Sequence, residues 1–143
     1  MSKIIGYTTG VFDLFHVGHL NVLRNAKSMC DHLIVGCSTD ELVQSYKNKK
    51  PIIPFIERCE ILQHVIYVDT VVAQDNMDKV AQCKKVHANI MFVGDDWYGT
   101  DKWNKIEEEL AAESIKLVYF PYTKGTSSTK INEILDFFRE EYL

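Results

Sequence analysis

Two histidines separated by a valine and a glycine, in the segment FDLFHVGHL, are the residues of this sequence best suited to chemistry. At the start of a helix, the spacing of His16 and His19 places both side chains on one side. Gly18 leaves room for a group that approaches the backbone. The N–H groups and partial positive charge of a helix N-terminus attract anions, and imidazoles add hydrogen-bond donors. The segment predicts an anion site. The alternative is that the two histidines lie on an amphipathic helix and that one of them caps it. Metal binding is less favoured, because no third ligand stands at a familiar spacing.

A second polar segment precedes the last expected helix. A glycine is followed there by four hydroxyl residues, in the order Gly125, Thr126, Ser127, Ser128, Thr129. One hydroxyl is enough to cap a helix, so the run indicates either a cap or a polyphosphate site at the helix N-terminus. The common nucleotide loops G-x-x-x-x-G-K-[ST] and G-x-G-x-x-G are both absent.

Two further segments carry charge or a flat aromatic ring. The basic loop KNKKP contains Lys47 and Lys49, and Arg58 follows in the next expected helix. It is either a solvated charge run or a lid whose ammonium groups cover phosphates. The segment GDDW follows an apolar strand, so Asp95 and Trp97 could bind a base or a sugar; capping of the next helix is the alternative role for the aspartates.

Strands and helices must alternate to position these segments. Apolar or β-branched runs predict strands over residues 3–9, 32–37, 67–72, 90–93 and 115–120. Apolar residues at helical spacing predict helices over residues 17–29, 40–46, 54–66, 77–86, 101–112 and from 131 onward. Such alternation predicts an α/β fold, a parallel sheet with helices on both faces. All four polar segments then lie at the carboxyl edge of the sheet, where ligands bind in such folds.

Composition sets the class of protein. The chain has 143 residues, and we expect a single domain over 1–143. Its formal net charge of -4 argues against general nucleic-acid binding. The four cysteines form no C-x-x-C pair and are expected to be reduced thiols. No apolar run approaches the ~20 residues that span a bilayer, and the first residues do not resemble a signal peptide. We therefore expect a cytoplasmic protein without a membrane partner.

Motifs over nearly the whole chain resemble the cytidylyltransferase family of the nucleotidyltransferase superfamily, and within it the small bacterial glycerol-3-phosphate cytidylyltransferases. The segment GVFDLFHVGH matches G-x-F-D-x-x-H-x-G-H. The motifs K-x-K, E-R, Y-V-D and G-D-D-W follow in order, and YTKGTSST matches R-T-x-G-x-S-T-T. The resemblance implies a Rossmann-like fold with five parallel strands, often in a homodimer. It also implies transfer of CMP from CTP to a small phosphorylated alcohol, with Mg²⁺ and with release of pyrophosphate.

The resemblance also implies roles for individual residues. The catalytic residues would be His16, His19, Lys47 and Arg58. The nucleotide would be bound by Gly10, Val11, Phe12, Gly18, Lys49, Asp95, Trp97, Tyr122, Thr123, Lys124, Gly125, Thr126, Ser127, Ser128 and Thr129. No residue is assigned to a metal. This set suits the chemistry, because a phosphate monoester is largely dianionic at neutral pH and needs no general base. It needs donors that offset the repulsion between two anions.

Two positions depart from the family pattern. Tyr122 stands where the family loop has arginine, and a phenol cannot pair bidentately with phosphate. We hypothesise that Lys124 restores the lost charge. Ile66 stands where glycerol-3-phosphate enzymes have arginine, so a basic residue near the acceptor is expected to be missing.

These departures leave three alternatives. The acceptor could be phosphocholine, phosphoethanolamine or another phosphorylated polyol, and aromatic residues such as Trp97 could enclose a quaternary ammonium. The nucleotide could be ATP, as in ADP-heptose synthases, which share the histidine motif. The chain could also be a nucleotide-binding module without catalysis. Tyr122 favours that last alternative, whereas retention of the histidines, lysines and arginine argues against it.

Overall fold

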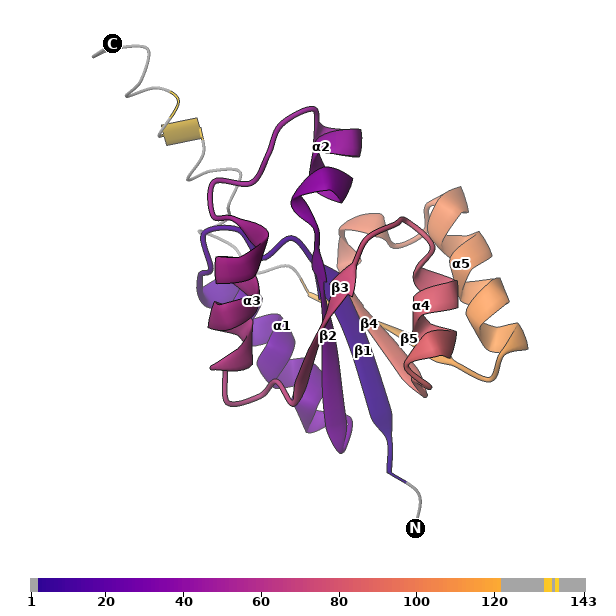
Figure 1. The fold of residues 1–143 in the computed structure, drawn as a ribbon. Helices are drawn as coiled ribbons and strands as arrows, with labels where there is room; N and C mark the ends of the chain where they lie inside the picture. Colours follow the sequence, from indigo (N-terminus) through magenta and orange to yellow (C-terminus); the bar gives the residue numbers. More distant parts are fainter. Residues whose placement is uncertain (1–2, 122–132, 135, 137–143) are drawn as a thin grey trace.

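The computed structural model describes residues 3–121, 133–134 and 136 (Figure 1). In this part of the chain, five parallel strands form one sheet in the order β3-β2-β1-β4-β5. The strands are β1 (Ile5–Gly10), β2 (His32–Ser38), β3 (Thr70–Gln74), β4 (Ile90–Gly94) and β5 (Lys116–Phe120). The helices are α1 (Val17–Ser28), α2 (Asp40–Lys47), α3 (Phe55–Gln63), α4 (Lys79–Lys85) and α5 (Asp101–Ala112), with a 3₁₀ turn η1 (Asp95–Trp97).

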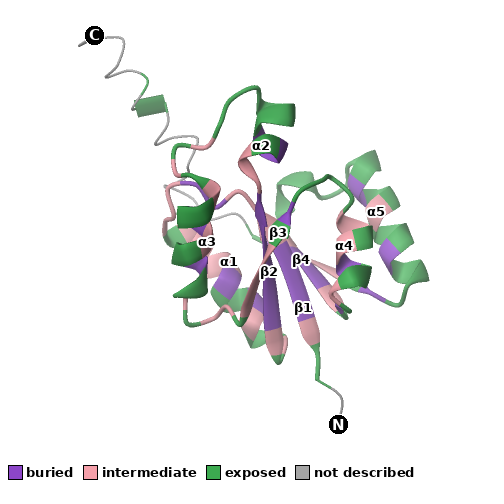
Figure 2. Ribbon diagram, viewed as in Figure 1, coloured by how far each residue is buried: buried purple, intermediate pink, exposed green. Residues whose placement is uncertain are grey.

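Helices cover both faces of the sheet, which confirms the predicted α/β class. Figure 1 shows α1 and α3 on one side and α4 and α5 on the other. Two hydrophobic clusters correspond to these layers. Leu23 of α1 and Leu62 of α3 are fully buried in the first, and Leu110 of α5 is fully buried in the second. Figure 2 shows the middle of the sheet buried between them. Near-continuous apolar strands are what a sheet covered on both faces requires.

The strand order places a binding edge next to β1. After β1 the chain adds β2 and β3 on one side, then returns to add β4 and β5 on the other. Ligands in parallel α/β sheets bind at such a reversal, outside the carboxyl ends of the strands. The turn from β1 into α1 and the end of β4 both lie at this edge. In Figure 1 the loop from α2 to α3 stands above the same edge.

The third strand begins later than the sequence predicts. The predicted strand covers residues 67–72, whereas β3 spans Thr70–Gln74. The amide of Val68 donates to the carbonyl of Val65, so the chain is still turning there after α3. Asp69 then meets β2, because its amide donates to Leu33 and its carboxylate accepts from the Leu33 amide. The hydrogen bonds of the turn therefore keep residues 67–69 out of the strand, although their composition favours a β-strand. The last predicted helix lies mostly outside the described residues, of which 133, 134 and 136 are helical.

A close contact between β1 and β2 gives a first prediction. A Cβ on Gly36 would lie 1.9 Å from the hydroxyl oxygen of Tyr7, which is fully buried and donates to Gln74. We expect Gly36→Ala to lower the free energy of unfolding by roughly 3 kcal/mol, since an added methyl forces packed neighbours apart. Thermal unfolding should show a melting temperature about 10 °C lower. Tyr7→Phe should cost less in the Gly36→Ala background than alone; equal costs would rule out this contact as the cause.

Candidate active site

The turn from β1 into α1 is tightly wound and brings the histidine segment to the carboxyl edge. Phe12 and Leu14 both have positive φ, at 54° and 51°. For side chains of this size the left-handed conformation costs roughly 1–2 kcal/mol per residue. Asp13, between them, is only 6% exposed despite its charge. Strained conformations of this kind occur where the surrounding structure fixes a functional segment.

Both histidines take part in capping α1. His16 is the N-cap residue, and its Nδ1 accepts a hydrogen bond from the Gly18 amide at 3.0 Å. His19, at the third helical position, returns the bond, because its Nδ1 accepts from the His16 amide at 3.2 Å. Capping boxes of this form usually pair Ser or Thr with Glu or Gln. The two rings stack with centroids 3.9 Å apart. The capping interpretation left open by the sequence is thus confirmed, and the two imidazoles lie side by side.

The caps fix which nitrogen of each histidine carries a proton. Since Nδ1 accepts in both rings, the proton of each neutral imidazole is on Nε2, which is left as a donor. Burial lowers the pKa of His19 to about 4, with His16 contributing and the charge of Asp13 opposing. Burial also lowers the pKa of His16. At neutral pH the pair therefore presents two neutral N–H donors beside a helix N-terminus, which suits an anion.

The lowered pKa of His19 predicts how stability depends on pH. Below pH 6.5 the unfolded chain binds a proton at this ring, whereas the folded chain does not until about pH 4. The free energy of unfolding should therefore fall between pH 6.5 and 4, by up to roughly 3 kcal/mol. Urea unfolding of the native chain and of His19→Asn, which keeps an acceptor for the cap, measures this effect. The variant should lose less stability on acidification, and parallel pH profiles would contradict the prediction.

The basic loop starts at the end of α2. Lys47 is the last residue of the helix, and Asn48 ends it in a left-handed conformation with a φ of 57°. Lys49 and the lysine after it are exposed. The loop is anchored further along, where the amides of Ile52 and Ile53 donate to the carboxylate of Asp13 at 2.8 and 2.9 Å. The loop that carries the lysines is thus attached to the turn that carries the histidines.

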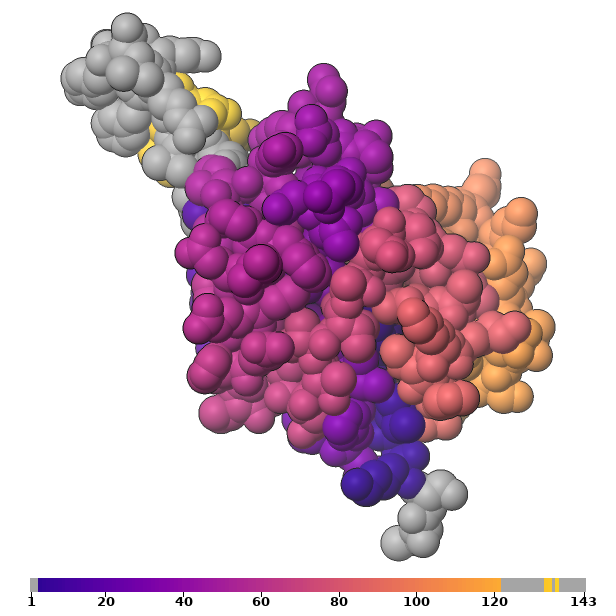
Figure 3. All heavy atoms as spheres, viewed as in Figure 1, coloured from indigo at the N-terminus to yellow at the C-terminus, as the bar shows by residue number. Residues whose placement is uncertain are grey.

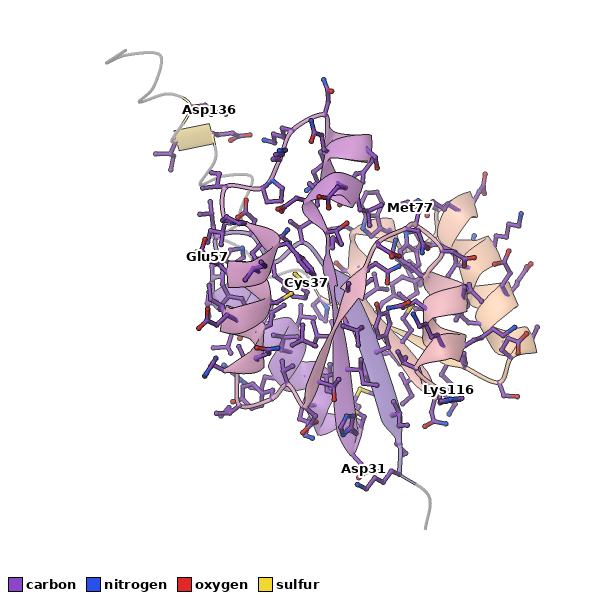
Figure 4. All side chains as sticks on the ribbon, in the orientation of Figure 1. Asp31, Cys37, Glu57, Met77, Lys116 and Asp136 are labelled. Carbon is purple, nitrogen blue, oxygen red and sulfur yellow. The ribbon has the colours of Figure 1, made fainter. Side chains whose placement is uncertain are left out.

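Arg58 is placed differently from the expectation that it contacts the reacting groups. Its side chain has no exposed surface. Its donors bind backbone carbonyls at 2.8 Å from three segments, and Asp40 at 2.6 Å; the carbonyls belong to Val11, Ser38 and Ile53. It also contacts the thiol of Cys37 at 3.3 Å. Figure 4 shows Cys37 between the sheet and α3, whereas Glu57 points away. The guanidinium thus holds three backbone segments of the site together through hydrogen bonds.

The end of β4 offers an open surface. Asp95 and Trp97 form the turn η1 directly after the strand, and the Trp97 side chain is 55% exposed. Gly94 has open space where a Cβ would be. The following helix is capped by Thr100, whose hydroxyl accepts from the Trp103 amide at 3.4 Å. The alternative in which the aspartates of GDDW cap α5 is therefore wrong, and these carboxylates are available for other partners.

Other predicted residues fall into two groups. Gly10 ends β1, Val11 and Phe12 follow at the carboxyl edge, and Gly18 lies in the first turn of α1. The residues of the last loop lie outside the described part of the chain; these are Tyr122, Thr123, Lys124, Gly125, Thr126, Ser127, Ser128 and Thr129.

Ile66 lies at the wrong edge of the sheet for the role expected of its position. It is 85% exposed and precedes β3. Asp69, just after it, bonds to Leu33 near the start of β2. Position 66 is thus at the amino edge, whereas the histidines are at the carboxyl edge. The isoleucine removes no charge from the site of its own chain, which corrects the expectation.

Sequence reasoning gave no role to Asp13 and Asp40, although both lie within the network around Arg58. Asp13 could have been noticed as a carboxylate inside the apolar run VFDLF, since a buried charge needs partners. Asp40 follows the Thr39 cap and gave no comparable signal.

Among the described residues, no group of three or more His, Cys, Asp or Glu side chains could hold a metal ion. Within the same ranges no helix has both the length and the apolar character needed to cross a membrane.

Comparison with known proteins identifies the family of this chain. The cytidylyltransferase-like family model matches residues 7–134. The chain belongs to the cytidylyltransferase-like family. It is 39% identical over 134 residues to glycerol-3-phosphate cytidylyltransferase of Bacillus subtilis (strain 168), covering 93% of this chain and 96% of that one. Membership of the family, with relatives of this kind, identifies the protein as a nucleotidyltransferase.

The chain is also similar to a second kind of nucleotidyltransferase and to a solved structure. The chain is 31% identical over 137 residues to an FAD synthase of Thermococcus kodakarensis, covering 94% of this chain and 91% of that one. The crystal structure of the lipopolysaccharide core biosynthesis protein from Thermoplasma volcanium GSS1 matches with a TM-score of 0.72. That match covers 87% of this chain and 100% of the other at 23% identity, and it shows the shared Rossmann-like fold.

Proposed function

We propose that this cytidylyltransferase-like protein transfers CMP from CTP to glycerol 3-phosphate, giving CDP-glycerol and pyrophosphate. A phosphate oxygen of the acceptor attacks the α-phosphorus of CTP and forms a P–O bond. The bond between the α-phosphorus and the bridging oxygen breaks, and its electron pair leaves with pyrophosphate. No proton needs to be removed from the acceptor, because its phosphate is largely dianionic at neutral pH.

The pair of stacked, neutral histidines is the observation that carries this proposal. Both Nδ1 atoms of His16 and His19 accept backbone N–H groups, so both Nε2–H groups remain as donors. Donors fixed before the reaction stabilise charge that develops on the phosphoryl oxygens, and they need no reorganisation. An imidazole pair that stays neutral also keeps its caps, since protonation at Nδ1 would remove the acceptor.

Cations and an aromatic surface complete the proposed site. The ammonium groups of Lys47 and Lys49 would offset repulsion between acceptor phosphate and triphosphate. Asp95 and Trp97 would bind the cytidine, the carboxylate by accepting hydrogen bonds and the indole by stacking. The residues from Tyr122 to Thr129 are proposed, from the family resemblance alone, to bind the terminal phosphates.

Mg²⁺ is proposed to arrive with the nucleotide. In nucleotide sites this ion takes phosphate oxygens and water together with one or two carboxylates. No cluster of acidic, histidine or cysteine side chains among the described residues could hold the ion by itself, so phosphate oxygens and water would supply most of its ligands. When bound, the ion would neutralise charge on the phosphates, and the histidines and lysines would still orient the α-phosphoryl group.

Adenylyl transfer from ATP is the second candidate. FAD contains an adenine nucleotide, and the likeness to the Thermococcus kodakarensis FAD synthase reaches 31% identity over most of both chains. The 39% identity to a glycerol-3-phosphate cytidylyltransferase favours CTP. Phosphocholine, phosphoethanolamine and other phosphorylated polyols remain the alternative acceptors for CMP.

A cytoplasmic homodimer with one catalytic domain per chain is part of the proposal. The outer surface of α3 and the turn after it exposes Ile56, Ile61 and Ile66, at 78%, 39% and 85%. This segment forms one side of the molecule in Figure 3. Exposed apolar side chains of this density are typical of subunit interfaces. All four cysteines are free thiols, as expected in a reducing compartment.

Pyrophosphate release from the purified protein with Mg²⁺ tests the proposed function. CTP, ATP, UTP and GTP would each be combined with glycerol 3-phosphate, phosphocholine, phosphoethanolamine, sugar phosphates and FMN. We expect turnover with CTP and glycerol 3-phosphate, and turnover lower by about 10²–10³-fold in the His16→Ala control. Turnover only with ATP would move the protein to the adenylyltransferases. Binding of CTP without turnover of any acceptor would favour a binding module.

A further inference from the structure

We infer that Asp13 is a positioning residue, which holds the basic loop over the histidine pair so that Lys49 and the imidazoles act on the same anion. The inference deepens the proposed function and rests on it. Asp13 lies three residues before His16, and its carboxylate binds the chain three residues after Lys49. One buried side chain thereby joins two cationic or donor segments that come from different parts of the sequence.

The carboxylate of Asp13 is turned toward the loop backbone. Oδ2 accepts from the Ile52 amide at 2.8 Å and Oδ1 accepts from the Ile53 amide at 2.9 Å. Bonds from backbone amides to an ionised carboxylate are short and about twice as strong as neutral ones. Because both oxygens are engaged in this way and the residue is 6% exposed, Asp13 is not presented to a substrate as a base.

Arg58 binds the same residue of the loop, Ile53, through its carbonyl group. The Ile53 amide donates to Asp13, and the Ile53 carbonyl accepts from Nε of Arg58 at 2.8 Å. The guanidinium also binds the Val11 carbonyl, at the start of the histidine turn. Buried Asp13 and buried Arg58 thus bind the amide and the carbonyl of Ile53, and they fix the base of the loop to the histidine turn.

The lysines themselves are exposed, so only the base of the loop restricts where they can go. From the Ile52 amide to Lys49 the chain spans three residues, or about 10 Å when extended. A shift of about 1 Å at the base of the loop would displace the ammonium groups by a similar distance. A misplacement of about that size can lower a rate a hundredfold. Asp13 thus affects nucleotide binding through the loop and without contacting the nucleotide.

A double-mutant cycle between Asp13→Asn and Lys49→Ala tests this coupling. The asparagine keeps the shape but presents an NH₂ group to one of the two amides. The readout is the Kd for CTP, measured by calorimetry without acceptor, or for ATP if ATP is the donor. We expect each single change to weaken binding about tenfold, and the double change to weaken it about tenfold as well. A hundredfold loss in the double variant would mean independent effects and would overturn the inference.

Asp69→Asn is the matched control. Asp69 also accepts a backbone amide, that of Leu33, and pairs with Lys27, but it lies at the amino edge of the sheet. It should show no coupling to Lys49→Ala, whatever its effect on stability. Coupling of equal size at Asp69 would mean that general loosening of the fold explains the result at Asp13.

A second variant keeps the test decisive if Asp13→Asn fails to fold. Ile52→Pro removes the donor from the loop side and leaves Asp13 intact. It should weaken CTP binding about tenfold and likewise show no further loss with Lys49→Ala. Hydrogen exchange at the Ile53 amide should become faster in Asp13→Asn, and unchanged exchange would contradict the geometry. If the wild-type protein binds CTP but turns over no acceptor, the proposed reaction fails while the cycle still measures the role of Asp13.

Discussion

His16→Asn is expected to lower kcat by about 10²–10³-fold while leaving the melting temperature close to that of the native chain. Asparagine is among the best N-cap residues, so its side chain can accept the Gly18 amide as Nδ1 does now. It has no atom in the place of Nε2, so the donor that is proposed to bind the phosphoryl group is lost. Removal of one such preorganised donor costs that factor in other enzymes. Steady-state kinetics with CTP and glycerol 3-phosphate, together with thermal unfolding, measure both effects.

His16→Ala provides the comparison, because it removes the cap as well as the donor. It should match the asparagine variant in kcat and additionally lose about 1 kcal/mol of stability. If His16→Asn retained more than a tenth of the native kcat, the histidine would be a cap and the proposed catalytic role would fail.

Arg58→Ala is expected to destabilise the protein by about 3–5 kcal/mol. The change orphans the carbonyls of Val11, Ser38 and Ile53, and it leaves Asp40 without the cation it now meets at 2.6 Å. Unsatisfied buried acceptors and an uncompensated charge are among the few causes of losses this large. Urea unfolding at low temperature measures the effect, because a domain of this size has only roughly 5–15 kcal/mol in total.

Asp40→Asn separates the ion pair from the carbonyl contacts. The carboxylate of Asp40 is 28% exposed and also accepts from the Phe55 amide, which an asparagine oxygen can still do. We expect a loss of about 1 kcal/mol, in the range of partly exposed pairs. A loss equal to that of Arg58→Ala would show that the ion pair, rather than the three carbonyls, explains the importance of the arginine.

The sequence predicted most of the fold because its signals are local. Helical spacing and buried-length apolar runs located the α-helices α1 to α5 and the five strands, and α5 begins and ends at the predicted residues. Where the predicted bounds of a strand were wrong, a hydrogen bond between residues far apart in the sequence set the true bounds. The third strand starts at Thr70 because the turn and Asp69 bind the chain before it, and Asp69 reaches Leu33 thirty-six residues away. Residue types alone do not show such a bond.

The position of the two histidines at one helix end could be predicted for the same reason, but the surroundings of each charged residue could not. The spacing of His16 and His19 placed two imidazoles at one helix end, and the structure shows them stacked there. Arg58 and the lysines looked alike as cations near a phosphate. Only burial separated them, since the guanidinium is enclosed by carbonyls while Lys49 is exposed.

The sequence by itself determined the α/β class and the position of the histidine pair at the carboxyl edge of the sheet, because each depends on spacing within a short segment. The tertiary structure decided the protonation of the imidazoles, the buried position of Arg58 and the attachment of the basic loop to Asp13. These depend on desolvation and on hydrogen bonds between segments up to forty-seven residues apart. A charge in this chain acquires its role from the neighbours that folding gives it.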